Sequence, residues 1–150
     1  MEYKQESFLS FIDECEDIIK DHWKHIALDQ DSVPLEPDWE KYIAMTDLGI
    51  VHLTTARTED GTLAGYAIYL ISNALHYKSL EVAEADVFWL GFEHRKGMTG
   101  IKMLKCAERD LKKLGVQKIF NKVKLHADVG KIFEFMGYTA VERVYAKGLT

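Results

Sequence analysis

One stretch of this sequence constrains the fold more than any other, an apolar run followed by a glycine-containing basic loop and an amphipathic segment. The unbroken run Val87–Leu90 is typical of a central strand that is buried on both faces of a sheet. The loop Arg95–Gly100 comes next, and the apolar spacing then predicts a helix from Ile101 that ends before Gly115. A strand, a tight loop and a helix in this order predict an α/β architecture.

The loop Arg95–Gly100 has the composition of an anion-binding turn. Its glycines let the backbone turn tightly and present N–H groups, and the helix N-terminus adds a partial positive charge. Arg95 and Lys96 add two full charges. The spacing matches neither a Walker A loop nor the G-x-G-x-x-G dinucleotide motif. We therefore predict a phosphate or pyrophosphate cradle, with an ordinary strand-to-helix turn as the alternative.

The segments before this loop predict two helices and a hairpin. Apolar residues at helical spacing indicate a helix over 8–26, capped by Ser7 or Ser10, and a second short helix follows over about 37–45. The dipeptide Asp60-Gly61 joins two strand-like segments, 50–57 and 63–71, as an antiparallel hairpin.

The C-terminal part predicts further strands and one short helix. Strand-like segments cover 81–92 and 116–125. A short helix follows, with Asp128 as its candidate N-cap and Gly137 at its end. A closing strand or hairpin arm is expected over 138–149. We expect residues 1–150 to form one domain, with a mixed central sheet of about six strands flanked by helices.

Charge is distributed unevenly along a chain whose net charge is −5. Residues 1–93 carry 6 Lys and Arg against 19 Asp and Glu, whereas residues 94–131 carry 11 against 3. A basic segment inside an acidic protein favours a local anion site, although such residues can also merely solvate a helix face. The acidic remainder argues against a nucleic-acid binder, since phosphate contacts need a broad basic surface.

Cysteine usage and hydropathy indicate a cytoplasmic protein. Cys15 and Cys106 cannot form a disulfide framework, and both fall on apolar helix faces. No apolar run approaches the roughly 20 residues of a membrane span, and the first residues do not resemble a signal peptide. The stretch His126-Ala127-Asp128 has no metal-ligand spacing with either cysteine, and we expect no metal.

Three segments together resemble the GNAT superfamily of N-acetyltransferases. The pattern Arg95-x-x-Met98-x-Gly100 is similar to the acetyl-CoA-binding motif of that family. The segment 132–138 resembles its Leu-Tyr-Glu-x-Leu-Gly-Phe motif, and residues 144–149 resemble its closing strand. The resemblance covers about residues 45–150. The layout is especially similar to small GNAT proteins of tailed bacteriophages, which would place the protein in the host cytoplasm.

The resemblance implies a coenzyme A site with named residues. The backbone of the strand residues would pair with the pantetheine arm, the loop amides would hold the pyrophosphate, and His126 stands where the family often has a cofactor-contacting asparagine. The residues concerned are Phe88, Trp89, Leu90, Arg95, Lys96, Gly97, Met98, Thr99, Gly100, Ile101 and His126. The chain departs from the family at Met98, where a glycine is usual, and at Phe133, where many members have the tyrosine that protonates the thiolate.

The resemblance also suggests a catalytic base. A primary amine is protonated at pH 7, so a group must remove a proton before the amine attacks a thioester. Glu84 precedes Arg95 by eleven residues, a spacing similar to the catalytic glutamate of GNAT histone acetyltransferases. Asp86 would share its face on a regular strand. Both carboxylates are candidates, with a plain exposed strand start as the alternative, and Tyr77 or Tyr138 could serve the leaving sulfur.

Together these features predict an acetyl-CoA-dependent N-acetyltransferase. A primary amine on a small cationic molecule or a protein would attack acetyl-CoA directly in a ternary complex. The alternative is a GNAT-like binding protein that grips a partner without catalysis, a reading that Phe133 favours. We expect neither nucleic acid nor membrane as a partner, and a homodimer stays open.

Overall fold

A five-stranded sheet in the order β1-β2-β3-β4-β5 forms the centre of the computed structural model, which describes residues 1–149. Strands β1 to β4 pair with one another in antiparallel fashion, and β5 is parallel to β4. The strands are β1 (Glu2–Gln5), β2 (Val51–Arg57), β3 (Leu63–Ala74), β4 (Tyr77–Leu90) and β5 (Lys118–Phe120). The helices are α1 (Phe8–Ile12), α2 (Glu16–Ile26), α3 (Trp39–Asp47), α4 (Thr99–Lys113) and α5 (Gly130–Phe135), with 3₁₀ turns η1 (Phe92–His94) and η2 (Leu125–Ala127).

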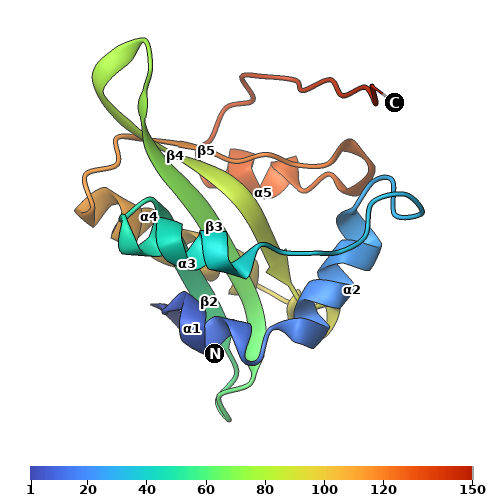
Figure 1. Cartoon of the computed structure of the whole chain (residues 1–150). Coiled ribbons are helices and arrows are strands. Elements are labelled where there is room, and N and C mark those ends of the chain that lie inside the picture. The colour runs from blue at the N-terminus through green and yellow to red at the C-terminus, as the bar shows by residue number, and fades with distance from the viewer. Residues whose placement is uncertain (150) are drawn as a thin grey trace.

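Helices cover both faces of the sheet (Figure 1). Helices α1, α2 and α3 pack on one face, where Phe8, Phe11 and Trp89 belong to one apolar core. Helices α4 and α5 pack on the other face, where Leu111 and Phe133 belong to a second core. The sheet therefore supplies side chains to two cores, as an α/β fold requires.

Several predicted elements are confirmed. The hairpin of β2 and β3 turns through Gly61, whose φ of +88° suits the absence of a side chain. Helix α4 ends before Gly115, which has a φ of +97°. Cys15 and Cys106 are both buried and unpaired, as their positions on apolar faces indicate.

The N-terminal prediction is wrong in two respects. The chain begins with strand β1, which lies antiparallel to β2 and was not expected. The single helix predicted over 8–26 is broken into α1 and α2 at Asp13–Cys15. The break has a physical reason, because it lets Glu14 reach the guanidinium of Arg57 at the end of β2, with Nη1 donating to Glu14 Oε2 at 3.0 Å. Ser7 is the cap of α1 and accepts from the Ser10 amide at 3.4 Å.

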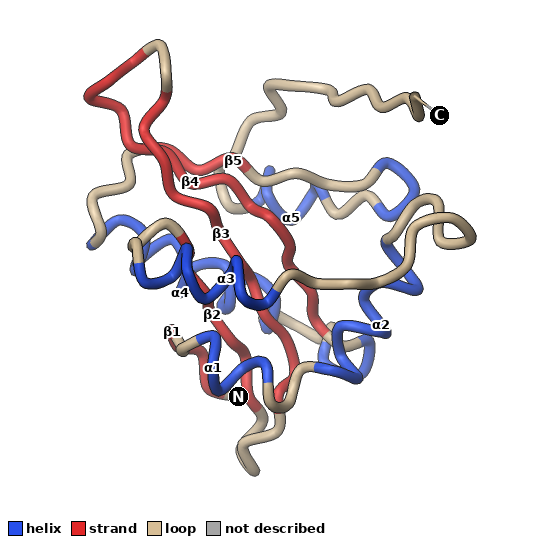
Figure 2. Tube along the Cα trace, in the orientation of Figure 1, coloured by secondary structure: helices blue, strands red, loops and turns tan. Residues whose placement is uncertain are grey.

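The C-terminal strands differ from the prediction as well. Strand β5 has 3 residues instead of the ten expected over 116–125. Residues 138–149 form no strand, so the described sheet has five strands where about six were expected (Figure 2). The amide of Tyr138 donates to the Phe133 carbonyl, but among the described residues no backbone hydrogen bond joins 139–149 to a strand, and strands need a partner to satisfy their backbone groups. Among residues 1–149, no helix combines the length and apolar composition needed to cross a membrane.

Strand β4 contains a bulge that matters for the site. Opposite it, Ile68 pairs with Val87 and the next residue, Tyr69, pairs with Ala85, so Asp86 is an extra residue. The bulge shifts the alternation of side chains by one residue. Before it the odd-numbered residue Ala85 faces the α4 core, and after it the even-numbered residue Phe88 faces that core.

Candidate functional site

The open edge of β4 is the first component of the site. Strand β5 pairs with β4 only at Val82, Ala83 and Glu84. From Ala85 to Leu90, β4 has no strand partner on that side among residues 1–149, while β3 pairs with its other side as far as Leu90. An unpaired strand edge offers N–H and C=O groups to an extended ligand.

This open edge leads into the loop before α4. Gly97 has a φ of +58°, and Met98 precedes the helix without a side-chain cap. Within the described chain, the amides of Gly97, Met98, Gly100 and Ile101 donate to no protein acceptor. Four unpaired N–H groups at the start of a 15-residue helix form a site suited to an anion. The predicted cradle is therefore geometrically available to a pyrophosphate.

Gly100 leaves the space in front of these amides open. A Cβ atom at this position would meet only Leu90 Cδ2, at 3.8 Å, which is ordinary van der Waals contact. The protein itself therefore does not require glycine here. A ligand held close to the backbone would require it.

Arg95 does not point into the cradle. Its guanidinium lies 4.3 Å from the centre of the Trp89 ring and 4.0 Å from that of Phe92, and its Nε donates to the Leu90 carbonyl at 2.7 Å. Burial lowers the pKa of Arg95, which nevertheless keeps its charge at neutral pH. Arg95 thus fastens the loop to the end of β4, and Lys96 is a second exposed cation in the same loop.

The two carboxylates on β4 have different partners. Glu84 accepts from Lys122 Nζ at 2.7 Å, and it pairs across with Phe120 at the last residue where β4 and β5 remain together. Asp86 lies in the bulge beyond that point, where its carboxylate accepts a hydrogen bond from the Tyr42 hydroxyl of α3. The sequence did not single out Tyr42, which is 44 positions from Asp86.

The tyrosines proposed for the leaving sulfur are not equivalent. Tyr77 is exposed at the hairpin end of the 14-residue strand β4, about 40 Å along the strand from Leu90. Tyr138 donates to Glu108 Oε1 at 2.6 Å, and burial together with this hydrogen bond raises its pKa. Phe133 is buried between Tyr138 and Phe88, with ring centroids 5.5 and 5.4 Å away. Neither tyrosine therefore supplies the hydroxyl that is missing at Phe133, where the resemblance to GNAT proteins would place a proton donor for the leaving sulfur.

The side chains of two other predicted residues differ in exposure. His126 is exposed on η2, and Trp89 is buried with only 4% of its surface accessible. Trp89 stacks on His22 at a centroid distance of 4.8 Å. His22 Nδ1 lies 2.5 Å from the Tyr66 hydroxyl, and burial, with Arg95 adding to it, lowers the pKa of His22 to about 4. His22 is therefore a neutral, structural histidine. Among the described residues, no three His, Cys, Asp or Glu side chains gather as a metal site.

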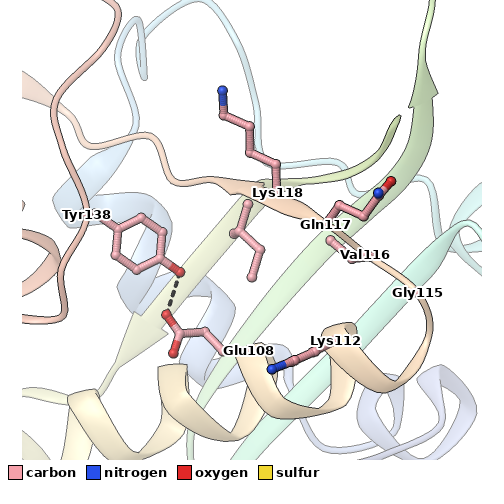
Figure 3. A pocket seen from close by; sticks show the side chains of 8 residues that line it. Glu108, Lys112, Gly115, Val116, Gln117, Lys118 and Tyr138 are labelled. Carbon is pink, nitrogen blue, oxygen red and sulfur yellow. Dashed lines mark hydrogen bonds between the residues drawn. The ribbon is translucent and has the colours of Figure 1, made fainter. Parts of the chain in front are cut away.

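A surface pocket of about 630 Å³ lies elsewhere, between the C-terminal end of α4 and β5 (Figure 3). Glu108, Lys112, Lys118 and Tyr138 line it, and the dashed line in Figure 3 marks the bond from Tyr138 to Glu108. The cradle is at the opposite end of α4, and Glu108, the lining residue of this helix nearest to it, lies about 13 Å along the axis from Thr99. This pocket is therefore separate from the candidate site.

Comparisons with known proteins identify the fold. No family model matches the chain, and no curated protein matches its sequence. Solved structures match over nearly the whole chain. A ribosomal-protein-alanine N-acetyltransferase from Brucella melitensis biovar Abortus 2308 has 12% identity and a TM-score of 0.73, with 99% of this chain and 100% of that chain covered.

Other acetyltransferases give the same result. A putative acetyl transferase from Pyrococcus furiosus has 20% identity and a TM-score of 0.70, over 99% of this chain and 100% of that chain. An aminoglycoside acetyltransferase from an uncultured soil metagenomic sample, in complex with sisomicin, has 12% identity and a TM-score of 0.74, over 99% and 95%. The chain is thus a single α/β domain that shares the fold of these acetyltransferase structures.

Proposed function

We propose that this protein is an acetyl-CoA-dependent N-acetyltransferase. The observation that carries the proposal is the continuity of two features, the open edge of β4 and the unpaired amides before α4. An extended ligand with a pyrophosphate at one end matches both, because the strand edge suits a pantetheine arm and the helix N-terminus suits phosphate. The fold shared with known acetyltransferases supports the same conclusion.

Acetyl-CoA supplies the thioester carbonyl that an amine attacks. The chain contributes the backbone N–H groups at the open end of β4, which are suitable donors to the carbonyl oxygen. Glu84 and Asp86 supply carboxylates that can take a proton from the amine. Phe133 supplies no proton, so the thiolate takes one from water or from the amine. A thiol of pKa about 8.5 is a fair leaving group without an acid.

A cationic amine is the acceptor that the charges favour. Residues 1–93, which carry 6 Lys and Arg against 19 Asp and Glu, include both carboxylates and the helices on their face of the sheet. An acidic surface attracts an ammonium group. Small polyamines, aminoglycosides and protein amines all fit this description. A bacteriophage source and a cytoplasmic location remain predictions from the sequence.

Calorimetric titration with acetyl-CoA tests the proposal. We expect the wild-type protein to bind, and Gly100→Val to abolish binding, because the new side chain fills the space in front of the amides while meeting only Leu90 within the protein. Gly148→Val is the matched control, since a Cβ there meets nothing within 4 Å and the residue lies outside the proposed cradle. Absence of binding by the wild type, or normal binding by folded Gly100→Val, would contradict the assignment.

A binding protein without catalysis is the second candidate, and the buried phenylalanine at position 133 favours it. The two candidates differ in one measurement. A transferase acetylates at least one amine in a panel of spermidine, an aminoglycoside and a lysine peptide. Binding of acetyl-CoA with no transfer to any of them would favour the binding protein.

A further inference from the structure

Asp86 is held by a residue from a different element. The bulge in β4 places the Asp86 carboxylate against α3, where Oδ2 accepts the Tyr42 hydroxyl hydrogen. No protein donor reaches the other oxygen, Oδ1, among residues 1–149. The carboxylate is therefore fixed at one oxygen and available at the other.

Tyr42 is itself well fixed. Its ring stacks on Phe8 of α1 at a centroid distance of 5.2 Å with an interplanar angle of 14°, and it lies 5.8 Å from the ring of Trp39. Burial, together with the hydrogen bond to Asp86, raises the pKa of Tyr42. Its hydroxyl consequently keeps its hydrogen near neutral pH and acts only as a donor to Asp86.

The neighbouring titratable groups Tyr66 and Glu84 do not occupy the free oxygen of the Asp86 carboxylate. Tyr66 of β3 lies near it, and burial raises the pKa of that phenol, so Tyr66 stays neutral. Glu84 is on the same strand, but it is paired with Lys122. Glu84 also lies where β5 still borders β4, whereas Asp86 lies past the last β5 pair and next to the open edge.

We propose that Tyr42 is a positioning residue that fixes the Asp86 carboxylate so that its second oxygen accepts the proton of the acceptor amine. This inference rests on the proposed function and assigns the base within it. The proton moves from the amine nitrogen to Asp86 Oδ1. The nitrogen lone pair then forms the C–N bond, the C–S bond breaks, and the sulfur leaves with the electron pair and is later protonated.

Tyr42→Phe tests the inference, because it removes the hydroxyl and keeps the stacked ring. We expect kcat/KM for the acetylated amine to fall about 10–100-fold, the value of a hydrogen bond to a charged group, while acetyl-CoA affinity stays within about twofold. In an Asp86→Asn background, Tyr42→Phe should have almost no further effect, since the two residues act as one unit. Tyr77→Phe is the matched control, because that tyrosine is exposed far from the site.

Proton NMR gives a readout that does not depend on the acceptor. We expect a slowly exchanging hydroxyl resonance that is lost in both Tyr42→Phe and Asp86→Asn and kept in Tyr77→Phe. Additive losses in the double variant, or no such resonance, would overturn the positioning role. If acetyl-CoA binds and no amine is acetylated, the proposed function is wrong together with the base assignment, while the resonance still decides whether Tyr42 holds Asp86.

Discussion

Glu84 and Asp86 lie two residues apart on β4 but differ in how readily each carboxylate can accept a proton from an amine. Glu84 is tied to the ammonium of Lys122, so it must give up an ion pair before it can take a proton. Asp86 has one oxygen held by a neutral hydroxyl and lies beside the open part of β4. The difference comes from the bulge, which is a property of the backbone and not of either side chain.

The variants Asp86→Asn and Glu84→Gln should therefore differ in turnover. We expect Asp86→Asn to lower kcat by about 10²–10⁴-fold, the usual range for a positioned general base, and Glu84→Gln by less than about tenfold. The loss in Asp86→Asn should shrink at high pH, where more of the amine is deprotonated without help. A steady-state pH series with one amine measures both effects, and a larger defect in Glu84→Gln would exchange the two roles.

The sequence was sufficient to name candidate site residues, but it did not predict which side chains contact them. The cradle glycines and both carboxylates could be named because their motifs are local. Tyr42 could not, since it lies 44 positions from Asp86 and meets it only through the packing of α3. Arg95 was expected among the phosphates, but the faces of Trp89 and Phe92 attract its guanidinium instead.

Helix α2 is joined to the sheet by a buried histidine. His22 is 8% exposed, stacks on Trp89 and contacts the Tyr66 hydroxyl. Burial lowers its pKa from 6.5 to about 4. In the unfolded chain the imidazole therefore takes up a proton at a higher pH than in the folded protein. Falling pH then favours the unfolded state, and the stability that neutral His22 provides is lost between about pH 6.5 and 4.

A thermal unfolding series over this pH range tests the role of His22. The wild type should lose up to about 3 kcal/mol between pH 6.5 and 4, since each pKa unit corresponds to about 1.4 kcal/mol. His22→Phe should be flat over that interval, and His76→Phe, at the exposed hairpin tip, should behave like the wild type. Equal slopes for wild type and His22→Phe would show that another group controls the acid sensitivity.

Elements with strong local signals were predicted and those that depend on distant pairing were not. The β2–β3 hairpin and α4 carry turn residues and apolar spacing within their own segments. Strand β1 has no apolar alternation, because it is a mostly exposed edge strand defined by its pairing with β2. Residues 138–149 have the composition of a strand, but composition cannot supply a neighbouring edge.

The whole molecule separates its charges. The basic segment 94–131 contains the loop before α4, and the acidic residues 1–93 form α1, α2 and α3 on the other face of the sheet. A polyanion and a polycation would thus be drawn to different parts of one small protein. Two substrates of opposite charge can be held at once without competing for the same surface.

Salt should consequently weaken acetyl-CoA binding. Between about 0.05 M and 0.5 M NaCl we expect a clear fall in affinity, because screening reduces the attraction between a polyanion and exposed cations. Duplex DNA should bind poorly near physiological salt, because the acidic remainder repels it. Calorimetry for the nucleotide and fluorescence anisotropy for the DNA measure these quantities. Tight DNA binding that coenzyme A does not disturb would favour a nucleic-acid binder.

The extra residue in β4 also makes a deletion informative. Phe88 and Leu90 face the α4 core and Val87 and Trp89 face the opposite core, while Ala85 and Val87 pair with adjacent residues of β3 on either side of Asp86. Loss of that one codon would therefore restore regular alternation and leave these four side chains in their present cores. An in-frame deletion of Asp86 would remove the bulge and its carboxylate without exchanging side chains between the two cores. The extra residue is thus not needed to fill the interior, and what it adds to the strand is the carboxylate that accepts from the Tyr42 hydroxyl.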